Sequence, residues 1–264
     1  MLKLENIYKT FNPGTVNEKV ALQGVDLHLE PGEFVTVIGG NGAGKSTMLN
    51  AIAGVYGVDS GRILIDGVDV TFLPEYKRAR SIGRVFQDPM MGTAASMQIE
   101  ENLALAARRG KSRTLRSGIT AAERQKYRDA LKTLDLGLED RMTAKVGLLS
   151  GGQRQALTLL MATLQQPNIL LLDEHTAALD PKTAAKVLEV TERIVQASNL
   201  TTLMITHNMR DAIVHGNRLI MMYDGKILVD VRGEEKRNLT VEHLMSLFSQ
   251  ASGSEVTSDK LLLS

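Results

Sequence analysis

The sequence GGNGAGKST, residues 39–47, decides the fold of this chain. It follows a short apolar run at residues 34–38 and precedes helix-forming residues at 48–53. The spacing of glycine, lysine and serine fits the phosphate-binding pattern GxxxxGK[ST], which lies between a strand and a helix. Glycines permit a tight turn whose backbone N–H groups point at one anion, and the next helix adds its positive dipole end. We therefore expect a phosphate-binding loop, called here the phosphate loop.

The phosphate loop supplies side chains as well as backbone groups. Lys45 adds a mobile positive charge for the outer phosphates, and Ser46 offers a hydroxyl to Mg²⁺, which usually takes only one or two protein ligands. A glycine-rich turn without a ligand is the alternative, but motif and context agree on phosphate. The expected ligand contacts are Gly39, Gly40, Asn41, Gly42, Ala43, Gly44, Lys45, Ser46 and Thr47.

The composition is that of a protein able to form its own core. The chain has 264 residues, no cysteine and a net charge of +1. The lack of cysteine excludes a disulfide scaffold and weakly favours the cytoplasm. No apolar run approaches the roughly 18 residues of a membrane-spanning helix, and the N-terminus lacks the apolar core of a signal peptide. The near-neutral charge argues against a nucleic-acid binder that depends on bulk electrostatics.

Strands and helices alternate through most of the sequence. Asp66-Gly67 and Asp224-Gly225 are typical hairpin turns. The expected strands and hairpins cover residues 2–7, 25–30, 34–38, 61–70, 81–86, 169–172, 202–206 and 219–231, and the expected helices cover 48–53, 151–166, 181–197 and 241–248. This alternation predicts an α/β fold with a mainly parallel sheet, and with the hairpins in a side sheet or at an edge.

Residues 88–150 differ from the rest and predict an inserted helical subdomain. Helical spacing and good helix formers occupy residues 99–107 and 121–136. Between them, residues 108–119 carry five basic residues and no acidic one, in the sequence RRGKSRTLRSGI. We expect an exposed loop here, solvated or close to anionic lipid headgroups.

Polar residues directly follow four apolar runs of the expected parallel sheet. Gly39 follows FVTVI, Gln87 follows IGRVF, Asp173 and Glu174 follow ILLL, and His207 follows TTLMIT. The carboxyl ends of parallel strands lie along one edge of an open sheet, where ligands bind. We therefore expect these polar groups to meet around one phosphate at this carboxyl edge.

The residues of the carboxyl edge have distinct expected roles. Asp173 ends a strand too apolar to leave a carboxylate uncompensated, so we expect it to hold Mg²⁺ with Ser46. Glu174 points the other way and is the candidate base for an attacking water, a role worth about 10²–10⁴-fold in rate. Gln87 is expected to orient water or complete the metal shell, and His207 to donate to a γ-phosphate oxygen. The alternatives are helix-capping acids, a strand-end glutamine, and a capping or core histidine.

A second glycine-rich signature, LSGGQ at residues 149–153, begins another expected helix. It also presents backbone N–H groups, a serine hydroxyl and a helix dipole to an anion. A simple helix N-cap is the alternative. Two anion-binding half-sites in one chain favour a head-to-tail pair of chains with each ligand sandwiched between them. The residues concerned are Ser150, Gly151, Gly152 and Gln153.

Together these motifs resemble those of the ATP-binding cassette family, the nucleotide-binding subunits of ABC transporters. The resemblance covers about residues 2–232 and rests on the order of GGNGAGKST, Gln87, LSGGQ, ILLLDE, the turn Ala178-Leu179-Asp180, and His207. It implies an α/β fold with a P-loop NTPase core, a mainly parallel sheet, an antiparallel β side sheet and the inserted helical subdomain. The implied single ABC ATPase domain, 1–249, comprises a RecA-like core (1–87 and 151–232), the helical subdomain (88–150) and a C-terminal helix (240–249), followed by a flexible tail (250–264).

The resemblance implies ATP with Mg²⁺, held in a sandwich of two chains. The phosphate loop of one chain and residues 150–153 of the other would bind the nucleotide, with Asp180 among the contacts. Phe11 matches the aromatic residue that stacks on adenine, a contact worth about 1–3 kcal/mol if base stacking in nucleic acids is a guide. Tyr8 is the second choice, and a core or loop aromatic is the alternative for Phe11. The implied catalytic residues are Glu174, His207, Gln87 and Lys45, and the implied metal ligands are Ser46, Gln87 and Asp173.

Two positions depart from the usual family pattern. His175 stands where members usually have proline after the catalytic glutamate, and Gly40 stands where proline or serine is common. Neither change removes a reacting group. We expect His175 to be a structural substitution with some loss of local stiffness, because proline fixes φ and histidine does not. The alternative is that His175 contacts the partner chain near Asp180.

The resemblance is to the energising subunit of a bacterial-type importer. The sequence EENL at residues 100–103 fits importers of amino acids and similar solutes, and DEHTAALDPKT at 173–183 fits a subgroup paired with branched-chain-amino-acid-like permeases. Residues 88–105 would face the permease. The implied partners are a second copy of the chain, transmembrane permease subunits and, indirectly, an extracytoplasmic solute-binding protein. The implied location is peripheral, at the cytoplasmic face of the cell membrane.

Two other functions remain open. The ATPase of an exporter or lipid-handling complex would share all the site residues and differ only at its docking surface. A non-transport member acting on DNA or ribosomes predicts two cassettes in one chain, a long coiled-coil insertion or a basic face. The basic residues at 108–116 are its only support, so no nucleic-acid partner is expected.

Overall fold

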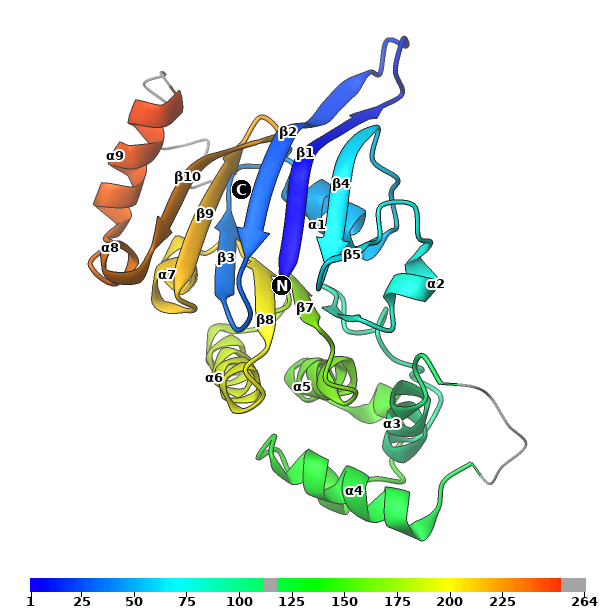
Figure 1. The fold of residues 1–264 in the computed structure, drawn as a ribbon. Coiled ribbons are helices and arrows are strands. Elements are labelled where there is room, and N and C mark those ends of the chain that lie inside the picture. The colour runs from blue at the N-terminus through cyan, green and yellow to red at the C-terminus, as the bar shows by residue number, and fades with distance from the viewer. Residues whose placement is uncertain (112–117, 253–264) are drawn as a thin grey trace.

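The computed structural model describes residues 1–111 and 118–252, which form two β-sheets with helices packed around them (Figure 1). The strands are β1 (Leu2–Phe11), β2 (Lys19–Leu29), β3 (Phe34–Ile38), β4 (Ser60–Ile65), β5 (Val68–Asp69), β6 (Ile82–Val85), β7 (Ile169–Asp173), β8 (Thr201–Ile205), β9 (Arg218–Tyr223) and β10 (Lys226–Arg232). The helices are α1 (Lys45–Ala53), α2 (Glu75–Arg78), α3 (Ile99–Ala107), α4 (Ala121–Lys132), α5 (Gly151–Thr163), α6 (Pro181–Ala197), α7 (Met209–Val214), α8 (Gly233–Arg237) and α9 (Val241–Ser252), with 3₁₀ turns η1 (Leu138–Asp140) and η2 (Val146–Leu148).

The larger sheet is the predicted parallel core. Its strand order is β10-β9-β3-β8-β7-β6; the strands from β9 to β6 are parallel to one another, and β10 is antiparallel to β9. The strands β3 and β8 are buried at every residue, and β7 at all but its last, in agreement with their continuous apolar sequences. The carboxyl ends of β3, β8, β7 and β6 lie at one edge, so the residues that follow them are brought together.

The smaller sheet is antiparallel, with the order β2-β1-β4-β5, and is the predicted side sheet. Both β1 and β2 are longer than predicted, because the hairpin continues to pair as far as Phe11 and Lys19. Helix α1 lies between the two sheets and contacts both (Figure 1). Its side chains Leu49 and Ile52 are fully buried in the core there.

The two predicted hairpins belong to different sheets. The β4–β5 hairpin extends the side sheet, whereas the β9–β10 hairpin forms an edge of the larger sheet. Both turns have positive φ angles, 49° and 78° at Asp66-Gly67 and 44° and 72° at Asp224-Gly225. These are the angles that an Asp-Gly hairpin turn requires, so the sequence was sufficient to locate both turns.

The helical subdomain packs against α5, away from the side sheet (Figure 1). Helix α4 ends at Lys132 rather than at residue 136, because the chain turns through left-handed conformations at Asp135 and Gly137, with φ of 56° and 67°. Side chains of α3, α4 and α5 share one apolar core, which includes the fully buried Leu103 and Leu131.

The prediction of a solvated basic loop at residues 108–119 is wrong for Arg109. Arg108 Nη1 donates to the carbonyl of Ala104 at 2.9 Å, and Arg109 Nη2 donates to the carbonyl of Ala162 at 2.9 Å. Burial lowers the pKa of Arg109. Arg109 thus pairs with a carbonyl of α5 instead of facing solvent, whereas the Arg108 side chain remains 40% exposed. Residues 112–117 lie outside the described part of the chain.

Helix α9 packs on the β9–β10 edge of the larger sheet. Phe248 is buried there, with its ring 5.4 Å from that of Tyr223 in a T-shaped contact. The helix continues to Ser252, past the predicted end at 249, because the sequence has no glycine or proline before Gly253. The remainder of the predicted flexible tail, residues 253–264, lies outside the described residues.

Candidate active site

The phosphate loop connects the buried strand β3 to α1, as predicted. Gly39 and Gly44 have φ of 149° and 100°, in the region that favours glycine. Close neighbours also exclude side chains at these positions. A Cβ on Gly44 would lie 2.6 Å from the Ala21 carbonyl oxygen, and one on Gly39 would overlap the Met222 carbonyl oxygen. The loop is therefore a concavity lined by backbone groups at a helix N-terminus, which suits an anion.

Lys45 lies inside this concavity and is only 5% exposed. Its Nζ donates to the carbonyl oxygens of Gly39 at 2.6 Å and Gly40 at 3.2 Å. Burial lowers the pKa of Lys45, while the nearby carboxylates of Glu174 and Asp173 oppose that shift. An ammonium group has three donors, so one remains available for a ligand without breaking either contact.

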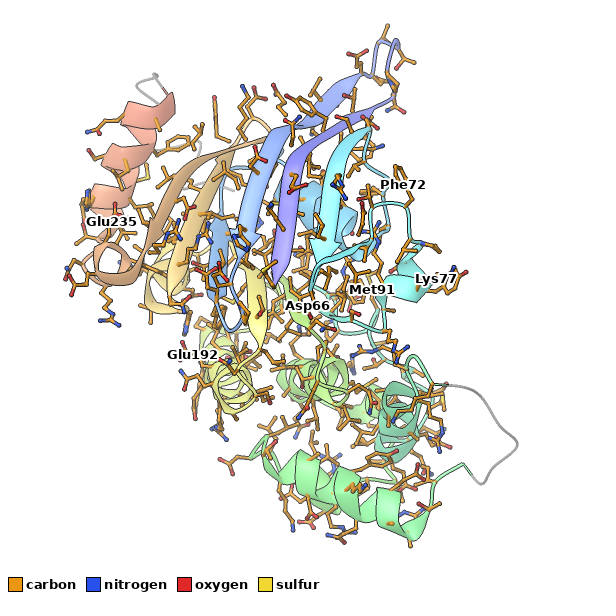
Figure 2. The ribbon with its side chains drawn as sticks, viewed as in Figure 1. Asp66, Phe72, Lys77, Met91, Glu192 and Glu235 are labelled. Atoms are coloured by element: carbon orange, nitrogen blue, oxygen red, sulfur yellow. The ribbon has the colours of Figure 1, made fainter. Side chains whose placement is uncertain are left out.

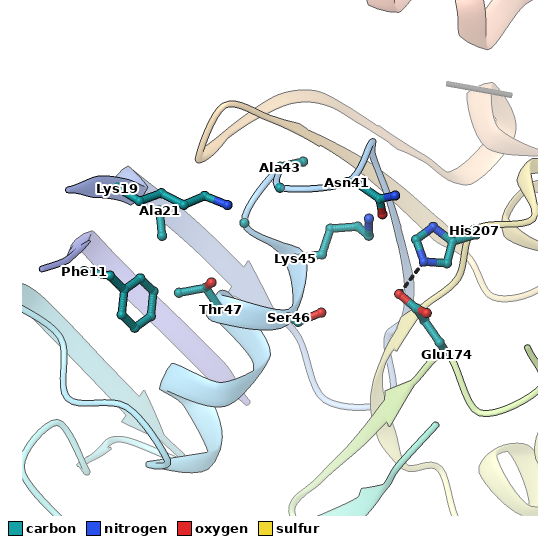
Figure 3. A pocket seen from close by; sticks show the side chains of 12 residues that line it. Phe11, Lys19, Ala21, Asn41, Ala43, Lys45, Ser46, Thr47, Glu174 and His207 are labelled. Atoms are coloured by element: carbon teal, nitrogen blue, oxygen red, sulfur yellow. Dashed lines mark ion pairs between the residues drawn. The ribbon is translucent and has the colours of Figure 1, made fainter. Parts of the chain in front are cut away.

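Most of the predicted site residues line a single pocket (Figure 3). Its lining consists of Phe11, Lys19, Ala21, Asn41, Gly42, Ala43, Gly44, Lys45, Ser46, Thr47, Glu174 and His207. Figure 3 shows Phe11 at one end, the phosphate loop in the middle, and Glu174 with His207 at the other end. The pocket thus offers an aromatic ring, an anion cradle and an acid–base pair in that spatial order.

Phe11 reaches the pocket because it pairs with Lys19 in the β1–β2 hairpin. Its ring has a T-shaped contact with Tyr56, at 5.2 Å between centroids, and Nζ of Lys9 lies 5.5 Å from its centre. Tyr8, the second choice for the aromatic contact, is absent from the pocket lining. Its hydroxyl lies instead beside Gly24, where an added Cβ would be 2.9 Å from the oxygen.

Glu174 and His207 meet at the carboxyl edge. Oε1 of Glu174 lies 2.6 Å from Nε2 of His207, and their side chains are 12% and 28% exposed. The Glu174 backbone has φ of 48°, a left-handed conformation that is uncommon outside glycine. Its N–H donates to the carbonyl of Ile205 on the neighbouring strand β8, at 3.1 Å. This turn directs the carboxylate away from β7 and toward the pocket.

Asp173 and Ser46 supply hard oxygen donors near the phosphate loop. Ser46 lines the pocket, and Asp173, at the end of β7, is 17% exposed. Burial raises the pKa of Asp173, whereas Arg84, Lys45 and His207 lower it. No group of three or more His, Cys, Asp or Glu side chains suited to a metal occurs in the described residues. A hydroxyl and a carboxylate fit Mg²⁺ whose other ligands are phosphate oxygens and water.

Of the four predicted catalytic residues, Gln87 alone is absent from the pocket lining. β6 ends at Val85, and Gln87 follows it as an exposed residue outside the pocket lining. It does follow a strand of the same carboxyl edge. Its predicted contact with water or metal therefore stays a prediction.

The second signature lies on a different surface of the chain. Ser150 caps α5 by accepting from the Gln153 N–H at 3.3 Å, and Gln153 Oε1 accepts from the Ser150 N–H at 3.2 Å. Both residues and Gly152 line a hollow between α5 and α6 that shares no residue with the pocket at the phosphate loop. Asp180 caps α6 by accepting from the Thr183 N–H at 3.1 Å. One chain therefore does not bring its two anion-binding signatures together.

The structure excludes the proposed contact of His175 with a partner chain. His175 is 2% exposed, and its Nε2 lies 3.1 Å from Oγ1 of Thr191 in α6. Burial, with a smaller effect of the nearby His215, lowers its pKa to about 4. The side chain is a neutral part of the core, which supports the structural interpretation of this position.

Three residues near the site were not singled out in the sequence. Lys19 and Ala21 of β2 line the pocket, and Arg84 of β6 contacts Asp173. The available signal for Arg84 was a charged residue within the apolar run IGRVF. Lys19 and Ala21 had no comparable signal, because their position depends on how β2 pairs with β1.

Comparisons with known proteins agree with this geometry. A sequence model of a family described as ABC transporter matches residues 22–177. The tyrosine transport ATP-binding protein of Clostridioides difficile is 45% identical over 251 residues, which cover 95% of this chain and 100% of that protein. The methionine import ATP-binding protein MetN of Corynebacterium diphtheriae is 37% identical over 233 residues, covering 86% of this chain and 64% of that protein.

A solved structure shares the fold. It is the dimeric post-hydrolysis state of the ATP-binding cassette MJ0796 with bound ADP and phosphate. The two chains superpose with a TM-score of 0.74 at 32% identity, over 88% of this chain and 98% of that one.

Proposed function

The chain belongs to the ABC transporter family of ATP-binding cassettes, and on this premise we propose that it is the ATP-hydrolysing subunit of an importer for a small solute. As a member of this family it is an ATPase that takes ATP with Mg²⁺. The observation that carries the site proposal is the order of groups along the pocket: Phe11, the phosphate loop, and Glu174 with His207. Adenine, the triphosphate and the attacking water require these groups in that order.

The phosphate-binding and catalytic residues have distinct tasks in the proposed reaction. The loop N–H groups and Lys45 bind the β- and γ-phosphates. Glu174 accepts the proton of the water that attacks the γ-phosphorus, while His207 donates to a γ-phosphate oxygen. Mg²⁺, when bound, neutralises charge on the phosphates. Ser46 and Asp173 are its proposed ligands, and Gln87 is the proposed residue that orients water or completes the metal shell.

We infer that a second copy of the chain completes each ATP site. Residues 150–153, of which Ser150 and Gly151 are exposed, and the exposed α6 cap, Asp180, lie outside the lining of the chain's own pocket. A head-to-tail pair would place the signature of one chain over the phosphate loop of the other, which gives two sandwiched ATP molecules. The dimeric state of the solved cassette with ADP and phosphate supports this arrangement.

The proposed solute is an amino acid, with an aromatic one as the first choice. The support is the likeness to a tyrosine transport and a methionine import protein. The earlier inference of a branched-chain-type permease stays a prediction. We propose a peripheral position at the cytoplasmic face of the membrane, with a permease as partner and a solute-binding protein as an indirect one. In the described part of the chain, no helix has the length and apolarity to cross a bilayer.

Exposed apolar side chains mark the proposed permease contact. Met91 is 70% exposed within the segment 88–105, and Phe72, just before α2, and Tyr76, within α2, are 92% and 75% exposed. Figure 2 shows Phe72 standing out from the α2 side of the molecule. Such residues favour contact with another protein over exposure to water.

Uptake by proteoliposomes tests the importer proposal. The chain is reconstituted with a candidate permease and a candidate solute-binding protein, and the transport of labelled tyrosine is followed. We expect tyrosine to accumulate on the side of the membrane that carries the chain, only with Mg·ATP. ATP-driven movement in the other direction would favour an exporter, and a several-fold stimulation of the free chain's ATPase by duplex DNA would favour the non-transport function.

A further inference from the structure

Arg84 is a largely buried cation beside a proposed magnesium ligand. It lies in β6, and its side chain is 13% exposed. Its Nη2 donates to Oδ1 of Asn50 at 2.7 Å and contacts Oδ2 of Asp173 at 3.4 Å. The guanidinium lies 4.5 Å from the centre of the Phe86 ring, and Nε has no hydrogen-bond partner among the described residues. Residues from three segments thus hold one guanidinium at the base of the site.

Asn50 fixes this guanidinium relative to both proposed ligands of Mg²⁺. Asn50 is at the i+4 position from Ser46 in α1, so the two side chains lie on the same face of the helix, one turn apart. Asp173 is the other ligand. Arg84 therefore contacts the carboxylate that would bind the ion and is anchored one turn beyond the hydroxyl that would bind it.

The charge of Arg84 is what distinguishes it from a packing residue. An apolar side chain would fill a buried position in β6 without desolvating a guanidinium or leaving Nε unpaired. A positive charge next to a magnesium ligand also opposes binding of the ion. The Arg84 charge therefore favours ATP binding mainly when Mg²⁺ is absent, because the Asp173 carboxylate would otherwise repel the triphosphate.

We propose that Arg84 is a resident counter-ion of Asp173, a positioning residue that lets the phosphate loop take ATP before Mg²⁺ is bound. The proposal rests on the proposed function only for its ligand, ATP in the phosphate loop. Lys45 and His207 also attract Asp173, but Lys45 faces the phosphates and His207 contacts Glu174. Arg84 stays with Asp173 when nucleotide binds. The affinity for ATP therefore depends less on Mg²⁺ in the wild-type chain than in a variant that lacks the Arg84 charge.

Calorimetric binding of the non-hydrolysable analogue AMP-PNP tests this proposal. The dissociation constant is measured in excess EDTA and in excess Mg²⁺. The value in EDTA is divided by the value in Mg²⁺, and this ratio is compared between the wild type and its variants. We expect Arg84→Met to raise the ratio about tenfold, because only the binding in EDTA loses its compensating charge. Arg84→Lys keeps the charge and is the matched control, with a ratio within about twofold of the wild-type value.

A second substitution separates charge from packing. Asp173→Asn removes the carboxylate that Arg84 compensates, so the double variant Arg84→Met/Asp173→Asn, which has neither charge, should bind in EDTA about as well as the wild type. An equal loss of affinity in EDTA and in Mg²⁺, with the ratio unchanged, would mean that Arg84 only packs, and it would overturn the proposal. Absence of binding to the wild-type chain in both conditions would instead contradict the proposed function. If Arg84→Met does not fold, Arg84→Gln, which keeps a donor for Asn50, carries the same expectation.

Discussion

Nε2 of His207 lies 2.6 Å from Oε1 of Glu174, across the carboxyl ends of the neighbouring strands β8 and β7. Glu174 has a left-handed backbone conformation, with φ of 48°, which directs its carboxylate toward His207. This conformation costs about 1 kcal/mol in a residue other than glycine. The contact engages Oε1 of Glu174 and leaves Oε2 for the attacking water. In the proposed reaction, Nε2 of His207 exchanges the Glu174 carboxylate for a γ-phosphate oxygen.

Replacing Glu174 tests its assignment as the base. Glu174→Gln keeps the shape and the hydrogen bond to His207 but cannot accept a proton. We expect ATPase turnover to fall by about 10²–10⁴-fold while ATP binding persists. The trapped ATP should hold two chains together, which light scattering in saturating Mg·ATP would detect as a dimer. A monomer under these conditions would count heavily against the sandwich.

Removing the Lys45 charge should weaken nucleotide binding. Lys45→Ala loses one charge-assisted contact to the phosphates, worth about 1.5–3 kcal/mol, or roughly 10–100-fold in affinity. Calorimetry with ATP measures this loss. Lys19→Ala is the matched control, because Lys19 lines the same pocket but is exposed. Equal effects of the two substitutions would contradict a special role of Lys45.

Alanine substitutions can test whether Phe11 or Tyr8 contacts adenine. Phe11→Ala should reduce ATP affinity by about 1–3 kcal/mol if stacking resembles that of nucleic-acid bases. Tyr8→Ala should leave it unchanged, because Tyr8 lies outside the pocket lining. Inorganic tripolyphosphate, which has no base, should bind both variants like the wild type. A loss of tripolyphosphate binding in Phe11→Ala would show that the ring shapes the phosphate loop instead.

The buried His175 makes stability depend on pH in a defined window. Its pKa is lowered to about 4 in the folded chain, mainly by burial, against 6.5 in the unfolded chain. Between these values the unfolded chain binds more protons, so stability falls as the pH drops from 6.5 toward 4 and has no contribution from His175 above 6.5. We expect a loss of about 2 kcal/mol from this residue between pH 7.5 and pH 5.

Urea unfolding of the wild type and His175→Gln measures this contribution. Glutamine has donors and acceptors for Thr191 but does not titrate, and the remaining titrating groups are shared by both proteins. The free energy of unfolding should therefore decrease less with acid in the variant. Parallel pH profiles would contradict the assignment of a neutral, buried histidine.

Much of the site was predictable because its parts depend on local chemistry. The phosphate loop needs glycines, a lysine and a helix start in sequence, and the Asp-Gly turns need only two adjacent residues. The carboxyl edge followed from apolar runs that end in polar residues. Where side chains contact across strands, the prediction was incomplete: His207 was expected at a phosphate and contacts Glu174, and Gln87 is exposed outside the pocket.

The sequence by itself thus determined the phosphate loop, the α/β alternation and the set of polar residues at the ends of the apolar strands. The tertiary structure decided that Phe11 lies opposite Lys19, that His175 is buried against Thr191, and that Arg84 reaches Asp173. The physical reason is that a phosphate loop is a property of consecutive residues. The partner of a buried histidine or arginine depends on the packing of segments that are far apart in the chain, and no local pattern encodes that packing.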